Sequence, residues 1–185
     1  PLPFVGVLIY ALIETAFFAL LPVYALRLGF AETAAATLLG VWIAGNILFQ
    51  IPLGWLADRW SRSRVAGLCA AVSALLLLAV PALAGGPTVW GLCLVMGGAM
   101  GALYAMSLGR LGDCFATADL TRANTAFVMA FQVGLLIGPA AVGAAMRAFV
   151  PDAFVVTLAL PLLVLLAACL VAPARPPPPR AAVPA

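Results

Sequence analysis

One acidic side chain lies in the middle of a long apolar stretch, where few residues offer any chemistry. Glu14 follows Tyr10 by one helical turn. Placing a charge at the centre of a membrane-spanning helix costs about 2.5 to 3.5 kcal/mol on insertion scales, so this carboxyl group must be protonated, paired or exposed to a water-filled cavity. Such a group can take up and release a proton as its surroundings change. The alternative is a neutral glutamic acid that only hydrogen-bonds a neighbouring helix.

Amide and aromatic side chains in other apolar stretches extend this set. Asn46 and Gln50 stand one helical turn apart, so they lie on one face of a helix. The candidate residues for substrate binding or proton coupling are Glu14, Tyr10, Asn46, Gln50, Tyr104 and Gln132. Amides inside membrane helices also serve only to hydrogen-bond adjacent helices, and that alternative stays open for each of them.

The composition predicts the elements that must position these residues. Hydrophobic residues make up 66% of the 185 and charged residues 8%, with a mean hydropathy of +1.21. A helix needs about 20 apolar residues to cross the hydrocarbon layer, and the runs are continuous where a β-barrel would alternate. We therefore expect an all-α membrane protein with a bundle over residues 1–172 and a Pro-rich, disordered tail over 173–185. The expected spans are approximately 3–26, 34–57, 65–84, 89–108, 122–147 and 153–172.

The arginines predict the orientation of this bundle. All nine basic residues are Arg, which suggests a GC-rich bacterial genome. Seven follow even-numbered spans, namely Arg59, Arg62, Arg64, Arg110, Arg122, Arg175 and Arg180, whereas only Arg27 and Arg147 follow odd-numbered ones. Because loops rich in Arg stay on the cytoplasmic side, both termini are expected to be cytoplasmic, with the bundle in a bacterial inner membrane.

The segment GWLADRWSRSR, residues 54–64, carries a more specific pattern than topology requires. It resembles the signature loop between the second and third helices of a six-helix half in the major facilitator superfamily (MFS) of secondary transporters. The matching residues are Gly54, Asp58, Arg59 and Arg62. Ser61 stands where a second Gly is usual, and the last basic residue is displaced to Arg64.

A physical role for this loop follows from its residue types. Gly54 leaves room for a neighbouring helix, and Asp58 can accept hydrogen bonds from the exposed N–H groups at another helix's N-terminus. We expect the Arg side chains to hold Asp58 and the anionic headgroups. An acid clasped to a helix end can be released when helices move, which suits a gate between two bundles. The alternative is a helix end followed by Arg residues that only fix topology.

A second motif lies in the fifth span, at GLLIGPAAVG, residues 134–143. It resembles the glycine and proline motif of the fifth helix in drug-exporting branches of the same family, through Gly134, Gly138, Pro139 and Gly143. Small residues let helices approach closely, and the proline removes one backbone hydrogen bond. Val142 replaces one of the usual glycines.

The family resemblance implies that six helices are one half of a larger transporter. MFS proteins contain two such halves around a central cavity, with the third and sixth helices of each half outside. The Pro-rich ending and the expected long loop within residues 108–127 favour the C-terminal half, with an N-terminal six-helix half as its partner.

The resulting functional hypothesis is alternating-access transport of a small molecule, proton-coupled and in the direction of efflux. We expect no cofactor, metal or nucleic-acid partner. Catalysis is disfavoured because the chain has no His, no CxxC pair and no Walker loop, and its four Asp are expected in loops. A self-contained six-helix channel, scaffold or homodimeric carrier is the alternative function.

Overall fold

The structure is a computed structural model that describes residues 2–83, 86–148 and 153–171, and these residues form six long helices. The helices are α1 (Leu2–Arg27), α2 (Glu32–Arg59), α3 (Arg62–Leu83), α4 (Thr88–Cys114), α5 (Thr117–Ala148) and α6 (Ala153–Val171). All six are long and apolar enough to cross a membrane. The expected all-α, six-helix class is confirmed. The tail predicted over 173–185 lies outside the described residues.

The connection between α4 and α5 differs from the expectation. A long loop was predicted within residues 108–127, but only Phe115 and Ala116 separate the two helices. Asp113 belongs to the last turns of α4 and Asp119 to the first turn of α5. The positive end of the α5 helix dipole stabilises the negative charge of Asp119. Asp58 likewise lies in the last turn of α2, so the prediction that these acids occupy loops is wrong. Asp152 is outside the described part of the chain.

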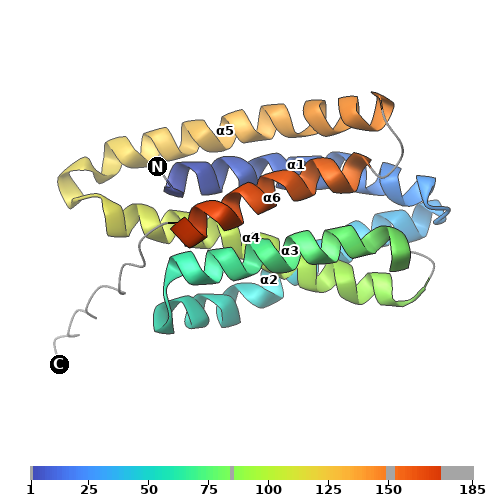
Figure 1. Ribbon diagram of the computed structural model, residues 1–185, viewed down its shortest axis with the longest axis horizontal. Coiled ribbons are helices and arrows are strands. Elements are labelled where there is room, and N and C mark those ends of the chain that lie inside the picture. Colours follow the sequence, from blue (N-terminus) through green and yellow to red (C-terminus); the bar gives the residue numbers. More distant parts are fainter. Residues whose placement is uncertain (1, 84–85, 149–152, 172–185) are drawn as a thin grey trace.

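Successive helices run in opposite directions, and three pairs form the main contacts (Figure 1). The most extensive packing joins α2 to α4, α1 to α5, and α3 to α6. Both α1 and α4 contact four other helices, so they form the centre of the bundle. The first helix begins and the last ends at the same end of the molecule.

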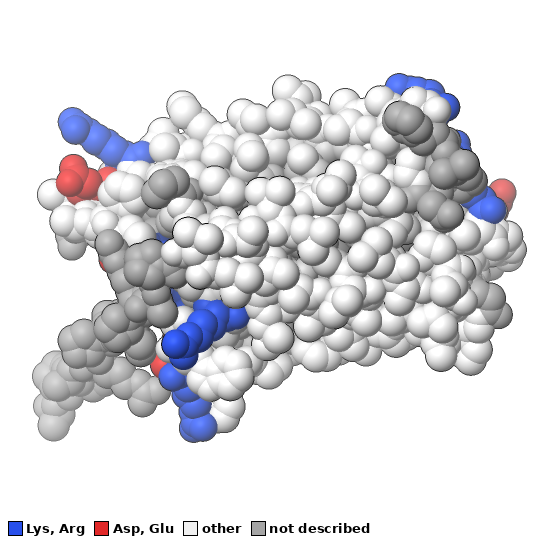
Figure 2. Space-filling view, viewed as in Figure 1, with Lys and Arg blue, Asp and Glu red and all other residues white. Residues whose placement is uncertain are grey.

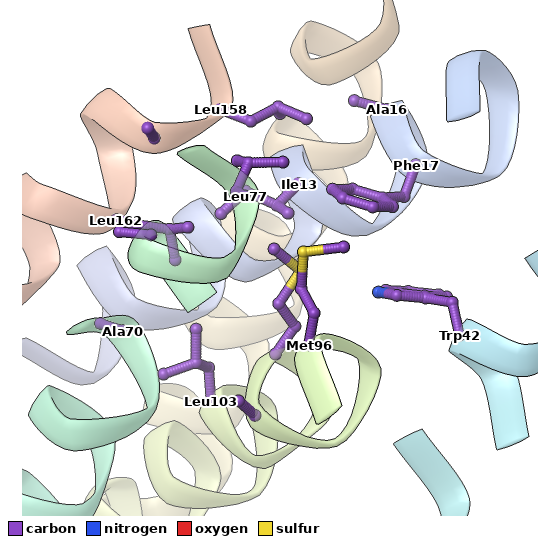
Figure 3. Packing of buried hydrophobic residues seen from close by; sticks show 14 of the residues in the cluster. Ile13, Ala16, Phe17, Trp42, Ala70, Leu77, Met96, Leu103, Leu158 and Leu162 are labelled. Carbon is purple, nitrogen blue, oxygen red and sulfur yellow. The ribbon is translucent and has the colours of Figure 1, made fainter. Parts of the chain in front are cut away.

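The core lies between α1, α3, α4 and α6 (Figure 3). Met96 and Leu103 of α4 pack there with Leu77 of α3 and Leu158 of α6. At its edge the rings of Phe17 and Trp42 stack with centroids 5.3 Å apart. Helices α2 and α5 contribute little to this core, because only 22% of the most apolar stretch of each is buried, against 61% in α4.

On the face seen in Figure 2, charged side chains gather at the two ends of the molecule and leave a belt without charged side chains between them. One of these ends is shaped by a tight turn after α1. Gly29 adopts a φ of +89°, and the Phe30 N–H donates to the carbonyl oxygen of Ala25 at 3.1 Å. This arrangement is a Schellman motif, which needs a residue in the left-handed region and therefore favours glycine. It turns the chain directly into α2.

Candidate functional site

The Glu14 side chain receives a hydrogen bond from its own helix. Tyr10 and Glu14 are four residues apart on α1, so their side chains lie on the same face. The Tyr10 hydroxyl donates to Glu14 Oε1 at 2.5 Å. Glu14 is half-buried, and among the described residues it makes no ion pair. A carboxyl group with one hydroxyl partner and an open side can meet a proton or a ligand.

Aromatic rings from α4 and α5 surround Tyr10. Its ring centroid lies 5.5 Å from that of Tyr104 on α4 and 6.3 Å from that of Phe131 on α5. Tyr104 also meets Phe131 edge-on at 5.8 Å and Phe127 at 5.9 Å. These separations are typical of favourable aromatic pairs. The rings pack around the residue that donates a hydrogen bond to Glu14.

The second helix brings an amide to the same place. Asn46 on α2 interacts with the Tyr10 side chain and accepts a hydrogen bond from Gln50 Nε2 at 3.1 Å. Gly101 of α4 lies directly against the Asn46 amide, where a side chain would not fit. We call Tyr10, Glu14, Asn46, Tyr104 and Phe131 the tyrosine cluster. It draws one or more residues from each of α1, α2, α4 and α5.

The remaining candidates are less closely joined. Gln50 reaches the cluster only through Asn46, and its side chain is exposed. Gln132 is also exposed and makes no hydrogen bond within the described chain. Its neighbour Phe131 makes the contact that α5 contributes. Sequence reasoning missed Phe131 and Phe127, although their spacing of one helical turn was a usable signal.

Glycines bring the helices of the site into backbone contact. A Cβ atom at Gly97 would overlap the Trp42 carbonyl group, and one at Gly45 would overlap that of Leu94, so α2 and α4 touch at two levels. This α4 series, which continues through Gly98 and Gly101, was not predicted. The clash expected at Gly98 is with the ring of Phe49.

The predicted glycine motif of α5 faces α1. A Cβ at Gly134 would meet the Leu8 carbonyl oxygen, and one at Gly138 that of Leu12. Gly143 lies in freer space, because the nearest atom to a Cβ there is Leu20 Cδ1 at 4.0 Å. Pro139 lies within α5 without ending it.

The gating-loop arginines hold a different acid from the one expected. Arg62 Nη1 lies 2.6 Å from Asp113 Oδ1 at the end of α4 and donates to the Gly109 carbonyl oxygen at 2.7 Å. Arg59 stacks on the ring of Trp55, with Cζ 3.6 Å from its centroid. The expectation that these arginines hold Asp58 is therefore wrong, because Arg62 begins α3 and points toward α4.

Three other residues of that loop remain open to an outside partner. Asp58 is exposed and has no hydrogen bond or ion pair within the described residues. Gly54 has no atom within 4 Å of the position where a Cβ would lie. Arg64 is exposed, and its backbone N–H donates to Ser61 Oγ at 3.3 Å.

The comparison with known proteins decides the family. The family model described as the Major Facilitator Superfamily matches residues 4–185. The chain belongs to the major facilitator superfamily. A relative in Bacillus subtilis (strain 168), the "Uncharacterized MFS-type transporter YfkF", is 33% identical over 141 residues. That alignment covers 76% of this chain and 36% of the relative.

Membership confirms the resemblance predicted from residues 54–64 and 134–143, and with six apolar helices it shows an integral membrane protein. The MFS chain spans little more than a third of the curated relative it matches. No group of three or more His, Cys, Asp or Glu that could hold a metal occurs in the described ranges.

Proposed function

We propose that this chain is one six-helix half of a secondary active transporter that moves a small molecule by alternating access. The observation that carries the proposal is the tyrosine cluster. It places a carboxyl group, an amide and three aromatic rings where four helices meet. Aromatic side chains with a few polar groups among them are the usual lining of a small-molecule site.

The other half of the transporter would cover the surfaces of α2 and α5. Both helices expose large apolar side chains, including Ile51 at 83% and Leu136 at 80%. Lipid could cover them, but α2 and α5 also flank the tyrosine cluster, so a second bundle seated there would enclose it. From the arginine distribution we infer that both termini are cytoplasmic, and from the family resemblance that a second six-helix half completes the transporter. Efflux is the direction implied by the drug-exporter-like motif of α5.

Glu14 would couple transport to protons. Of the acidic residues in the described spans, it lies deepest, and its Tyr10 partner can donate to either oxygen of a charged carboxylate. Exposure to the two sides of the membrane in turn would let it bind a proton on one side and release it on the other. Asp58, exposed at the end of α2, would act separately by clasping a helix end of the other half.

The test uses full-length protein in proteoliposomes. A panel of radiolabelled small molecules is screened for accumulation driven by an imposed pH gradient, and Glu14→Gln is then compared with the parent for the substrate found. We expect Glu14→Gln to abolish gradient-driven accumulation but to retain exchange without a gradient, because the amide keeps a hydrogen bond and loses the titrating proton. Glu32→Gln, at the exposed start of α2, is the matched control and should accumulate normally.

Accumulation by Glu14→Gln at the parent rate would remove Glu14 from coupling and leave it a structural hydrogen-bonding role. Failure of every compound on the panel with the parent protein would count against transport itself. A homodimeric carrier makes a separate prediction, namely that this chain expressed alone accumulates the same substrate.

A further inference from the structure

A groove runs along the outer surface of the bundle between α3 and α6, on the side away from the tyrosine cluster. Its volume is about 450 Å³, and it starts at the first turn of α3 and the last turns of α6. Its apolar walls include Leu68, Leu166 and Leu170. One end of the groove is polar, where Ser63 and Arg64 line it. A groove that is apolar along its length and basic at one end fits an amphipathic ligand.

The polar end holds hydrogen-bonding groups without partners. Ser63 is 2% exposed, and its Oγ has no hydrogen-bond partner within the described chain. Ser63 also lines a smaller adjoining pocket with Arg110, whose Nε is buried and likewise makes no hydrogen bond there. Arg110 also lies near Cys169, which lines the groove. Buried donors are normally satisfied, so these two indicate a polar ligand atom at this end.

The charges at this end favour an anion. Arg62, Arg64 and Arg110 lie around Ser63, and Asp113 is the acidic residue lining the adjoining pocket. Arg62 is already paired with Asp113. Arg64 and Arg110 therefore leave an excess of positive charge beside the groove.

We propose that this groove binds an anionic phospholipid, with the phosphate group at Ser63, Arg64 and Arg110 and an acyl chain along α3 and α6. Arginine recognises phosphate oxygens through charge-assisted hydrogen bonds, and basic pockets between membrane helices bind anionic headgroups. The apolar groove runs from the charged end of the bundle toward its uncharged middle. An acyl chain likewise runs from the headgroup toward the middle of the bilayer. The site lies outside the transport pathway and needs no substrate.

The Pro-rich segment that follows α6 in the sequence is a competing occupant, because Leu170 near the end of α6 lines the groove. Its charged residues, Arg175 and Arg180, are both basic. It would bring positive charge to a site that already has an excess of it, so charge complementarity favours the phospholipid.

The experiment measures lipid retention by the full-length protein. The protein is reconstituted in nanodiscs of phosphatidylglycerol and phosphatidylcholine in equal amounts, released into mild detergent and analysed by native mass spectrometry. We expect phosphatidylglycerol to be retained over phosphatidylcholine. Arg64→Gln should reduce that preference about fivefold, the change expected for one arginine at an anionic surface. Arg122→Gln, which removes an arginine from α5 at the same end of the bundle, is the control and should keep the preference.

A second pair of variants tests the acyl-chain part. Leu68→Trp places a bulky ring in the groove and should reduce retention of both lipids, whereas Leu75→Trp, on an exposed part of α3 outside the groove, should not. The proposal is overturned if Arg64→Gln and Arg122→Gln behave alike, or if Leu68→Trp retains as much lipid as Leu75→Trp. It is also overturned if deletion of residues 172–185 raises retention about fivefold or more, because the tail would then be the natural occupant.

Discussion

Two helix pairs, α2 with α4 and α1 with α5, flank the tyrosine cluster. Both pairs are in close contact through glycines, but the glycines lie on both helices of the first pair and on one helix of the second. If the chain is divided into α1–α3 and α4–α6, the pair α4 and α2 is the counterpart of the pair α1 and α5, as in the inverted three-helix repeats of MFS halves. In the first pair, Gly97 and Gly45 bring each helix against a carbonyl group of the other. In the second, the glycines that lie against carbonyl groups, Gly134 and Gly138, are both on α5.

The difference indicates which pair can adjust. Where α2 and α4 meet, the backbone of each helix lies directly against the backbone of the other. No side chain stands between them that could change rotamer to let the helices shift. The α1–α5 contact has glycines on one helix only, and it opens out toward Gly143. We infer that α2 and α4 form a fixed unit and that α5 can tilt on α1. A series of Gly→Ala substitutions should therefore give graded losses of stability.

The largest loss is expected for Gly97→Ala. Its methyl group would overlap the Trp42 carbonyl group, and backbone cannot rotate aside. Overpacking of this kind costs about 3 kcal/mol of the free energy of unfolding. Reversible unfolding in mixed micelles measures it, and Gly91→Ala, on the same helix with open space around it, is the control. Equal stabilities for the two variants would disprove the fixed unit.

A smaller loss is expected for Gly138→Ala. The added methyl group would meet the Leu12 carbonyl oxygen and lie 2.9 Å from Thr15 Oγ1. A tilt of α5 on α1, as inferred above, would relieve part of this clash. We expect about 1 to 2 kcal/mol in the same unfolding assay. Thr15→Ala combined with Gly138→Ala should restore only part of this loss, because the Leu12 carbonyl remains. Full recovery would show that the side chain alone sets the distance between α1 and α5.

Gly109→Ala should cost less again, about 1 kcal/mol. A Cβ there would lie 2.7 Å from Arg62 Nε, but a long side chain can shift where backbone cannot. The loss would come from the weakened contact of Arg62 with Asp113. In a double-mutant cycle, Gly109→Ala should therefore add little to Arg62→Ala. Additive losses would mean that Gly109 acts on something other than Arg62.

Gly143→Ala should have the smallest effect and the opposite sign. The nearest atom to the new methyl group is 4.0 Å away, so no clash opposes the better helix propensity of alanine. We expect a gain of about 0.5 kcal/mol. A loss as large as that of Gly138→Ala would show that the close α1–α5 contact continues to this level.

The sequence was sufficient for the helices but not for their contacts. Continuous apolar runs specify six spans because a membrane leaves few alternatives to a helix. The α4–α5 connection was mispredicted because helices do not end where the apolar run ends. Asp113 and Asp119 remain helical beyond it, stabilised by Arg62 in one case and by the helix dipole in the other.

The candidate site shows the same division. Tyr10 with Glu14, and Asn46 with Gln50, are pairs within one helix, so a spacing of four residues was enough to place them together. Phe131 required the rotation of α5 about its axis, and Asp113 required the register between α3 and α4. Neither quantity can be read from a single sequence, because both are set by which small residues of one helix meet which carbonyl groups of another.

The hydrogen bond from Arg27 to α5 has a consequence for how the protein is made. Arg27 Nη1 donates to the Met146 carbonyl oxygen at 3.2 Å, although 119 positions separate the two residues. When helices are synthesised and inserted one after another, α1 enters the membrane long before α5 exists. Until then the Arg27 side chain lacks its α5 partner in the nascent chain. The same is true of the α1 carbonyl groups that the α5 glycines contact. Although α1 is inserted before the other five helices of this bundle, it is therefore among the last of the six to be locked in place. A chain that stops before α5 exposes an unfinished surface to membrane proteases.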